Sequence, residues 1–382
     1  MHNPTHYLQS QKELKEFIDN KLSSYSQLRN FDFGKKEKNS VSHLSKYISH
    51  GIISEYYILK EVLKEFKYEK VEKFIHEVFW RIYWKGWLEL RPRVWKDYVS
   101  ATNEIIEPRG FSYAYSGKTN VDCFNKWMEE LKNKNYLHNH TRMWFASIWI
   151  FTLKLPWELG AKLFLKYLND GDTASNTLSW RWVAGLQTVG KHYVAKSWNI
   201  EKFTGGRFSN IFLEEQANAL IPKVSYEIEE ELPKYNQKKN DTLILFENDL
   251  NILDRKDFFE EYQKIFILLL DNESRNLELS ENVLNFKSKL IDDFCSEFKS
   301  KKVIKLKKFD SSIISENNLD VIYPCVGENY DYLKKCEKKY KINLNYIYKK
   351  EDIYCWSFSR KGFFNFKKNI PQIIDNLGFR II

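Results

Sequence analysis

Cysteine is scarce in this sequence of 382 residues, and its pattern excludes several kinds of site. Five cysteines are scattered along the chain without a CxxC pair, and no Cys/His cluster has the spacing of a zinc finger. We therefore expect neither a disulfide framework nor an iron–sulfur cluster held by cysteine, and we predict no metal site.

Long apolar runs and targeting signals are also missing. No apolar stretch reaches membrane-spanning length, and the opening MHNPTHYLQSQKELKEF lacks a cationic segment followed by an apolar one. We therefore expect a soluble cytoplasmic protein without a membrane partner. A GxGxxG or GKS/T fingerprint is absent after the first strand-like run, so the C-terminal part gives no sign of nucleotide binding.

Aromatic residues and positive charge are, by contrast, abundant. Aromatics make up 16% of the chain, with 12 tryptophans, and the net charge is +9. Because each buried indole N–H needs a partner, so many of them indicate a stacking surface, a bound aromatic cofactor or a redox path. A tryptophan-rich helical core is the simpler explanation for any one of them. The charge favours a polyanionic partner, although 48 of the 60 basic residues are Lys, which indicates a compositional bias.

Hydrophobic spacing divides the chain into two predicted domains. Residues 1–212 show apolar residues three and four positions apart, which is typical of helices. Residues 213–240 are polar with two prolines, and we expect a connecting segment that is helical in part. From 241 to 382 the short apolar runs TLILF, KIFILLL, LDVIYP and INLNYIY alternate with helix-like stretches, the last at about 362–376. This alternation predicts a small Rossmann-like α/β domain with a parallel sheet, following an all-helical domain.

The segment NDGDTASNTLSWRW, residues 169–182, concentrates acids, an amide and indoles. An EF-hand does not explain it, because positions 5, 6 and 12 of such a loop would hold alanine, serine and arginine. A helix cap at Asp172 fits the sequence but explains neither Asn176 nor the two tryptophans, Trp180 and Trp182.

A second segment, FIHEVFWRIYWKGW (74–87), places Glu77, Trp80, Arg81 and Trp84 on one helical face. An ion pair between Glu77 and Arg81 on a solvated face is the plainer alternative. That alternative would leave the neighbouring tryptophans exposed, so the pattern favours a site.

A third segment, LHNHTRMWFASIW (137–149), also gathers side chains typical of a binding site on one helical face. Asn139, Arg142, Met143 and Ala146 share a helical face. An amide, a guanidinium, a thioether and a small residue together indicate a pocket wall.

A fourth segment, NSVSHLSKYISHGIIS (39–54), combines a turn with the start of a helix. Ser40, Ser42 and Ser45 bring hydroxyls and backbone N–H groups to a helix N-terminus, which favours an anion such as a diphosphate. Serine is also the ordinary residue at a helix N-cap, so this segment alone indicates little.

Together and in this order, the strings YSQLRNF, VSHLSKYISHGIIS, HEVFWRIYWKGW, LHNHTRM and NDGDTASNTLSWRWVAG resemble the FAD-binding domain of the photolyase/cryptochrome superfamily. The resemblance covers most of residues 25–208. An α/β domain after the flavin domain resembles the small bacterial photolyases called NewPHL. The resemblance implies FAD as cofactor, with the C-terminal domain covering its site. It also implies light-driven repair of cyclobutane pyrimidine dimers by a monomer that prefers single-stranded DNA.

The resemblance also implies residue roles. The implied cofactor contacts are Tyr25, Ser42, Leu44, Ser45, Arg81, Asn139, Arg142, Asp170, Asp172 and Asn176. The implied substrate contacts are Glu77, Trp80, Asn139, Met143 and Trp182. Arg142 would pair with Asp170 beside the flavin ring, and Asn176 would face flavin N5. Glu77 would stabilise negative charge on the dimer.

The resemblance implies that electrons reach the flavin through Trp157 and then through Trp180, the indole nearest the flavin. The third, surface tryptophan of the family does not align, because the matching region offers only Phe111, Tyr113 and Tyr115. The exit of this path therefore stays open.

Two other functions remain as alternatives. A cryptochrome-like light sensor without repair activity would have lost the dimer-contact residues, which are present here. A scaffold that binds nucleic acid through charge alone would leave the acids and amides unexplained. Photolyases for the (6-4) lesion carry His where Asn139 and Met143 stand, so the chain resembles the type that repairs cyclobutane dimers.

Overall fold

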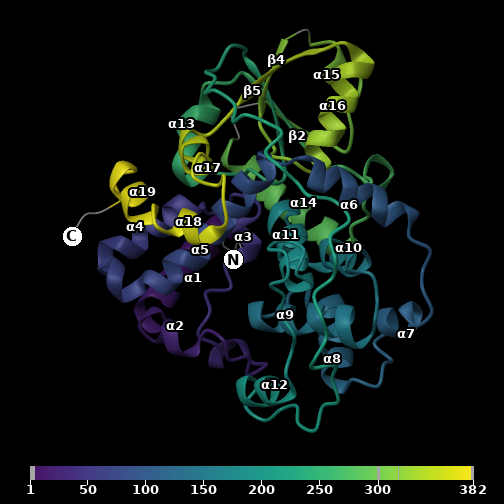
Figure 1. The fold of residues 1–382 in the computed structure, drawn as a ribbon. Helices are drawn as coiled ribbons and strands as arrows, with labels where there is room; N and C mark the ends of the chain where they lie inside the picture. Colours follow the sequence, from purple (N-terminus) through teal and green to yellow (C-terminus); the bar gives the residue numbers. More distant parts are fainter. Residues whose placement is uncertain (1–4, 299–301, 317, 380–382) are drawn as a thin grey trace.

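The computed structural model describes residues 5–298, 302–316 and 318–379. Helices make up the regular structure as far as Phe203, as expected from the sequence (Figure 1). In chain order they are α1 (His6–Asn20), α2 (Leu22–Leu28), the 3-10 turn η1 (Lys36–Lys38), α3 (Ser45–Ile48), α4 (Glu55–Glu65), α5 (Tyr68–Glu89), α6 (Arg93–Glu104), α7 (Phe111–Ser116), α8 (Asp122–Lys134), α9 (Asn139–Ser147), the π-helical turn η2 (Ile148–Thr152), α10 (Trp157–Tyr167), α11 (Thr173–Ala184) and α12 (Ser197–Phe203). Within the described residues, no helix is long and apolar enough to cross a membrane.

The connecting segment 213–240, all of which the structure describes, contains no helix or strand. The expectation of partial helix there is wrong, because the backbone of this segment bonds to the helices beneath it. Leu220 N–H donates to the Ala184 carbonyl at 2.9 Å, and Glu229 N–H donates to the Leu90 carbonyl at 3.0 Å. The segment therefore runs as an extended strap across the helical part.

Five parallel strands follow in the order β3-β2-β1-β4-β5, which confirms the predicted α/β part. The elements are β1 (Thr242–Phe246), α13 (Ile252–Glu260), β2 (Lys264–Leu268), η3 (Asn272–Ser274), α14 (Glu281–Glu297), β3 (Lys302–Leu306), α15 (Ser311–Ile314), β4 (Asn318–Ile322), α16 (Glu328–Tyr340), β5 (Asn343–Ile347), α17 (Lys350–Trp356), α18 (Phe363–Lys367) and α19 (Ile370–Asn376). The order reverses between β1 and β4, which creates a topological switch point at their carboxyl ends.

The helical part and the sheet share one hydrophobic core. On β1, Leu243 and Leu245 belong to a cluster that continues through the helices, whereas Ile244 and Phe246 belong to a second cluster on the opposite face of the sheet. This division follows the alternation of side chains along a strand. The two parts therefore bury apolar surface against each other and are not independent domains joined by a flexible linker.

Polar contacts over long sequence separations reinforce this shared core. The Tyr7 hydroxyl in α1 donates to the Leu250 carbonyl at 2.7 Å, and the His6 ring lies 2.5 Å from the Asp293 carboxylate in α14. The Ser54 hydroxyl, which also caps α4, donates to Asp254 at 2.5 Å. The first helices are thus fastened to the C-terminal part.

The last three helices leave the sheet and return to the helical part, where Figure 1 shows them beside α4 and α5. The sequence predicts one helix at 362–376, but the structure has α18 and α19, and Pro371 lies in the first turn of α19. Close approach between α17 and α5 explains Gly86, because a Cβ there would lie 2.6 Å from Cδ1 of Trp356. The C-terminal segment is therefore seated closely on α5.

Candidate functional site

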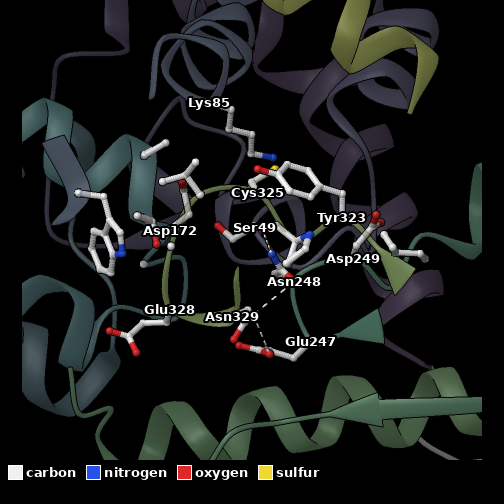
Figure 2. A pocket seen from close by; sticks show the side chains of 18 of the residues that line it. Ser49, Lys85, Asp172, Glu247, Asn248, Asp249, Tyr323, Cys325, Glu328 and Asn329 are labelled. Carbon is white, nitrogen blue, oxygen red and sulfur yellow. Dashed lines mark hydrogen bonds between the residues drawn. The ribbon is translucent and has the colours of Figure 1, made fainter. Parts of the chain in front are cut away.

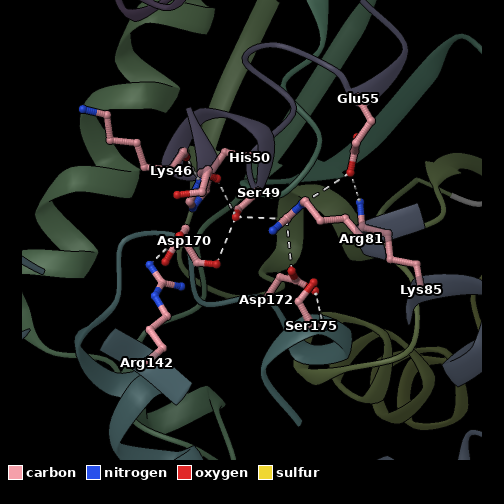
Figure 3. A network of polar contacts seen from close by, with 11 residues as sticks. Lys46, Ser49, His50, Glu55, Arg81, Lys85, Arg142, Asp170, Asp172 and Ser175 are labelled. Carbon is pink, nitrogen blue, oxygen red and sulfur yellow. Dashed lines mark hydrogen bonds and ion pairs between the residues drawn. The ribbon is translucent and has the colours of Figure 1, made fainter. Parts of the chain in front are cut away.

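The four segments singled out from the sequence converge on a buried network of charges (Figure 3). At its centre, the Arg81 guanidinium of α5 lies 3.0 Å from the Asp172 carboxylate, and its Nε lies 3.5 Å from Glu55. Arg81 also donates to the Ser49 hydroxyl at 3.1 Å. Burial alone would raise the pKa of Asp172, but the Arg81 and Lys85 charges outweigh burial and hold this pKa below its usual value. Both acids are therefore held as carboxylates.

Asp172 is also the N-cap of α11, because its carboxylate accepts from the Ser175 backbone N–H at 3.1 Å. The helix ends at Gly185, where φ is 83°, a left-handed conformation that favours glycine. The cap and the ion pair with Arg81 together fix where α11 begins, and so where Asn176 and the following tryptophans lie.

A second buried pair joins α9 to the segment before α11. The Arg142 guanidinium donates to the Asp170 carboxylate at 2.8 Å and, through Nε, to the Leu137 carbonyl at 2.9 Å. Burial would raise the pKa of Asp170, but Arg142 outweighs it and the pKa is lowered. The Asp170 backbone carbonyl accepts from Ser49 at 3.0 Å, which links this pair to the one at Arg81.

Asn176 lies one turn into α11 and is 8% exposed. Its side-chain amide donates to the Ala161 carbonyl of α10 at 2.8 Å, so the amide orientation is set by a backbone group. The side-chain oxygen is left as the acceptor that a ligand could reach. Its predicted position beside flavin N5 stays a prediction.

Glu77 and Trp80 lie at the outer part of α5, where both side chains are half-buried. Glu77 forms an ion pair with Arg29, which follows α2, whereas Arg81 pairs with Asp172 and Glu55. The alternative of an isolated pair between Glu77 and Arg81 is therefore wrong. One face of Trp80 stacks on Phe363 of α18, with ring centroids 3.6 Å apart and planes inclined by 14°. Only its other face and its edge can meet a substrate.

On α9, Asn139 is exposed in the first turn and Met143 is half-buried one turn later. This places both residues on the same side of the helix as Arg142 and its pair with Asp170. The helical spacing expected from the sequence is thus present, and their roles as cofactor or substrate contacts stay predictions.

The predicted phosphate-binding residues lie in and near α2 and α3. Tyr25 is buried on α2, where its ring meets Phe17 and Phe74, and burial raises its pKa. Ser42 and Ser45 are half-buried, and Leu44, fully buried, precedes the first turn of α3. Because α3 has only four residues, it adds little helix dipole, so an anion here would depend on the hydroxyls and backbone N–H groups.

The tryptophans of the predicted electron path are buried. The rings of Trp180 and Trp149 lie 6.4 Å apart, and the Trp157 ring stacks on Tyr98 at 5.4 Å. Trp182, half-buried on the outer side of α11, stacks on Tyr193 at 6.0 Å. Trp149, one of two candidates from the sequence for the open exit of this path together with Trp198, is thus a direct neighbour of Trp180.

Sequence reasoning missed Ser49, Glu55 and Arg29. Ser49 and Glu55 hold Arg81, and Arg29 holds Glu77. The signal for Arg29 was its place in the string YSQLRNF, but the two residues that it brings together are 48 positions apart. No local spacing reports such a contact. Among the residues that the structure describes, no group of three His, Cys, Asp or Glu side chains could hold a metal ion.

A cavity of about 120 Å³ adjoins this network where the helices meet the sheet (Figure 2). The loop after β1 and the first turn of α16 line it with Asn248 and Asn329, and the helical part contributes Ser49, Lys85 and Asp172. It is thus located at the switch point of the sheet, where ligands commonly bind. Its volume falls below the roughly 300–1,000 Å³ typical of cofactor pockets, so it is too small for a flavin.

Comparison with known proteins identifies the helical part. Residues 74–218 match the family model described as the FAD binding domain of DNA photolyase. This part of the chain is therefore similar to the FAD-binding domain of DNA photolyase. The match contains α5, α9 and α11, which carry both buried ion pairs, and it ends before the sheet begins.

Individual photolyases agree with this assignment over part of the chain. The deoxyribodipyrimidine photo-lyase of Buchnera aphidicola (subspecies Baizongia pistaciae) is 29% identical over 194 residues, which cover 48% of this chain and 39% of that protein. The enzyme of Streptomyces griseus is 35% identical over 119 residues, 31% of this chain and 26% of that protein. A crystal structure of a class III photolyase from Agrobacterium tumefaciens is 27% identical, with a TM-score of 0.43, and the match covers 53% of this chain and 43% of that chain. The chain therefore spans well under half the length of the photolyases it matches.

The site fits FAD, as this photolyase-type domain requires. Three of the buried polar atoms that have no hydrogen-bond partner among the described residues lie here: His43 Nε2 before α3, His138 Nε2 at the start of α9, and Asp170 Oδ1 before α11. Buried polar atoms are normally hydrogen-bonded, so unpaired atoms on three converging segments indicate a polar ligand. Arg142 and Arg81 would hold its charged or carbonyl groups, and Asn176 would face its ring.

Proposed function

We propose that the chain is a light-driven DNA repair enzyme, a photolyase that splits cyclobutane pyrimidine dimers, and that it prefers single-stranded DNA. The observation that carries the proposal is the middle of α5, where the half-buried Glu77 and Trp80 stand next to the buried pair of Arg81 and Asp172. The same helix thus places two side chains suited to binding a lesion, Glu77 and Trp80, next to Arg81, which is suited to binding a flavin. The photolyases that match over this region support the same activity.

A reduced flavin, held by Arg81, Arg142 and Asn176, would supply the light-driven electron-transfer chemistry that breaks the two carbon–carbon bonds of the dimer. The side chains of the protein bind and orient the lesion. Trp80 and Trp182 would pack against the extruded bases, because a lesion must leave the base stack to reach a buried cofactor. A single strand opens at lower cost than a duplex, which supports the proposed preference. Asn139 and Met143 would line the same space.

Arg29 gives Glu77 a clearer electrostatic role than the sequence suggested. A lone carboxylate would repel the negative charge that develops on the dimer, but the ion pair with Arg29 supplies a compensating positive charge at the same place. Glu77 can then hydrogen-bond the dimer while the pair as a whole stabilises the charge. Water is kept from the inner part of the site by the buried helices α9, α10 and α11.

The test is repair of a single-stranded oligonucleotide that carries one cyclobutane thymine dimer, with purified, reduced, flavin-loaded protein. We expect thymines to be restored under blue light and not in darkness, and more slowly when the same lesion lies in a duplex. A protein that binds and photoreduces flavin but restores no thymines in the light would refute repair and leave light sensing as the function. Equal rates on single strand and duplex would refute only the strand preference.

A further inference from the structure

The C-terminal helix α18 carries two differently placed sets of phenylalanines. Phe363 and Phe366 are buried against α5, where they contact Trp80 and Tyr83. Phe364, between them, is 79% exposed. Two of the three aromatic residues therefore attach the helix, and the third points to solvent immediately beside the ring that stacks on Trp80.

The position of α18 is fixed by more than apolar packing. The Tyr83 hydroxyl donates to the Lys361 carbonyl at 3.0 Å, and the Arg91 guanidinium donates to the Arg360 carbonyl at 2.8 Å. Both donors belong to the helical part, so the backbone just before α18 is held against it. The exposed ring of Phe364 is thus presented from a defined position and not from a loose tail.

Basic side chains predominate in the sequence around Phe364. Residues 353–374 contain four basic side chains and no Asp or Glu. Arg360, Lys361 and Lys368 are exposed, and Lys367 lies 3.5 Å from Glu72 on α5. An exposed aromatic ring among unpaired cations matches the chemistry of a nucleic-acid strand, which offers stacking bases and phosphates together.

We propose that α18 is part of the DNA-binding surface, that Phe364 stacks on an unpaired base next to the lesion, and that Arg360, Lys361 and Lys368 contact the phosphates of the same strand. This inference rests on the proposed repair function and adds a contact from outside the FAD-binding domain. It assigns the C-terminal segment a role in holding the strand while Trp80, fixed from behind by Phe363, meets the lesion.

The first experiment measures binding in darkness of a fluorescent single-stranded oligonucleotide with one cyclobutane dimer. Phe364→Ala should raise Kd about tenfold, within the range for loss of one stacked base. Phe364→Trp should restore affinity, because it keeps a stacking ring. Phe212→Ala is the matched control, since Phe212 is 91% exposed but lies just before the connecting strap, and it should leave Kd unchanged.

The second experiment separates the ring from the cations. In the double variant Lys361→Ala, Lys368→Ala, the slope of log K against log salt should become shallower by about 1.4, the value for two lost phosphate contacts on a single strand. Phe364→Ala should leave the slope unchanged. Unchanged affinity in Phe364→Ala would overturn the inference, as would an equal loss in Phe212→Ala.

The outcome for the wild-type protein distinguishes this inference from the proposed function. If the wild-type protein neither binds nor repairs the oligonucleotide, the repair proposal fails and this inference fails with it. If it repairs the dimer in the light while Phe364→Ala binds equally well, only the inference fails. Because Phe364 is exposed, its replacement should leave thermal unfolding unchanged, and a lowered Tm alongside weaker binding would reassign Phe364 to structure and overturn the inference.

Discussion

Helix α5 carries one acid near its middle and another at its C-terminal end, and the two acids are in opposite environments. Glu77, near the middle, keeps 32% of its side chain exposed and pairs with Arg29. Glu89 at the inner end is 7% exposed and accepts hydrogen bonds from the Tyr323 hydroxyl at 2.7 Å and the Val326 N–H at 2.8 Å. Burial raises the pKa of Glu89 to about 7. The same helix thus places a partly exposed carboxylate, Glu77, at the candidate site. Its buried carboxylate, Glu89, accepts hydrogen bonds from the segment that follows β4.

The comparison teaches that position along the helix, and not residue type, separates function from stability in this molecule. Arg81 lies between the two acids and is tied to Asp172 and Glu55. Substitution of Arg81 or Glu89 should therefore change the free energy of unfolding, and substitution of Glu77 should change repair.

The largest effect is expected from Arg81→Met. The change would leave the buried carboxylates of Asp172 and Glu55 without their shared guanidinium, which should lower the free energy of unfolding by about 3–5 kcal/mol. Urea denaturation measures it. The control is Arg93→Met, whose side chain is 55% exposed and pairs with Asp97 on the surface, and which should cost less than about 0.5 kcal/mol. Equal losses in the two variants would contradict a buried network at Arg81.

The next effect concerns pH and Glu89. The pKa is raised to about 7 in the folded protein from the ordinary glutamate value of 4.5, so between these values the folded state binds more protons than the unfolded state. The free energy of unfolding should therefore fall as pH rises through this window, by up to about 3 kcal/mol. Glu89→Gln should remove this part of the dependence.

Denaturation of the wild-type protein and Glu89→Gln at pH 5 and pH 8 measures the difference in slope, which cancels the contributions of other acids. The charges nearest Glu89 are those of Asp352 and Lys85, and both remain in the variant. Parallel pH profiles would show that Glu89 titrates normally and would remove the contrast with Glu77.

The smallest effect in free energy, but the one that reports on function, is expected from Glu77→Gln. Repair per absorbed photon should fall about tenfold, the size of one lost hydrogen bond to a charged group. Unfolding should change by less than about 1 kcal/mol, because the pair with Arg29 is about one-third exposed. Glu69→Gln, an exposed change in the first turn of the same helix, should alter neither quantity. Normal repair by Glu77→Gln with flavin bound would exclude Glu77 from the mechanism.

The sequence was informative where spacing is local. The faces of α5 and α9 followed from residues three and four apart, and the cap at Asp172 followed from its place before an apolar helix. The strand β3 was missed because its sequence, KVIKL, alternates Lys with apolar residues at the edge of the sheet and lacks the continuous apolar run of β1.

The sequence could not report contacts made by tertiary packing. Arg29 meets Glu77, Ser49 meets Arg81, and Phe363 meets Trp80 only because separate helices are brought together. The same holds for Tyr323 and Glu89, which are 234 positions apart. The family resemblance pointed to the residues of the FAD-binding domain and implied a C-terminal domain that covers the FAD site, but it named none of the residues through which the two parts meet.

The attachment of α1 to residues far along the chain also bears on how the protein folds as it is made. Tyr7 and His6 find their partners at Leu250 and Asp293, so α1 cannot complete its burial until those residues have left the ribosome. Domains generally fold in order from the N-terminus during synthesis, and contacts this distant slow folding. The first helix should therefore be among the last to dock, and its apolar face should be a natural target for chaperones in the nascent chain.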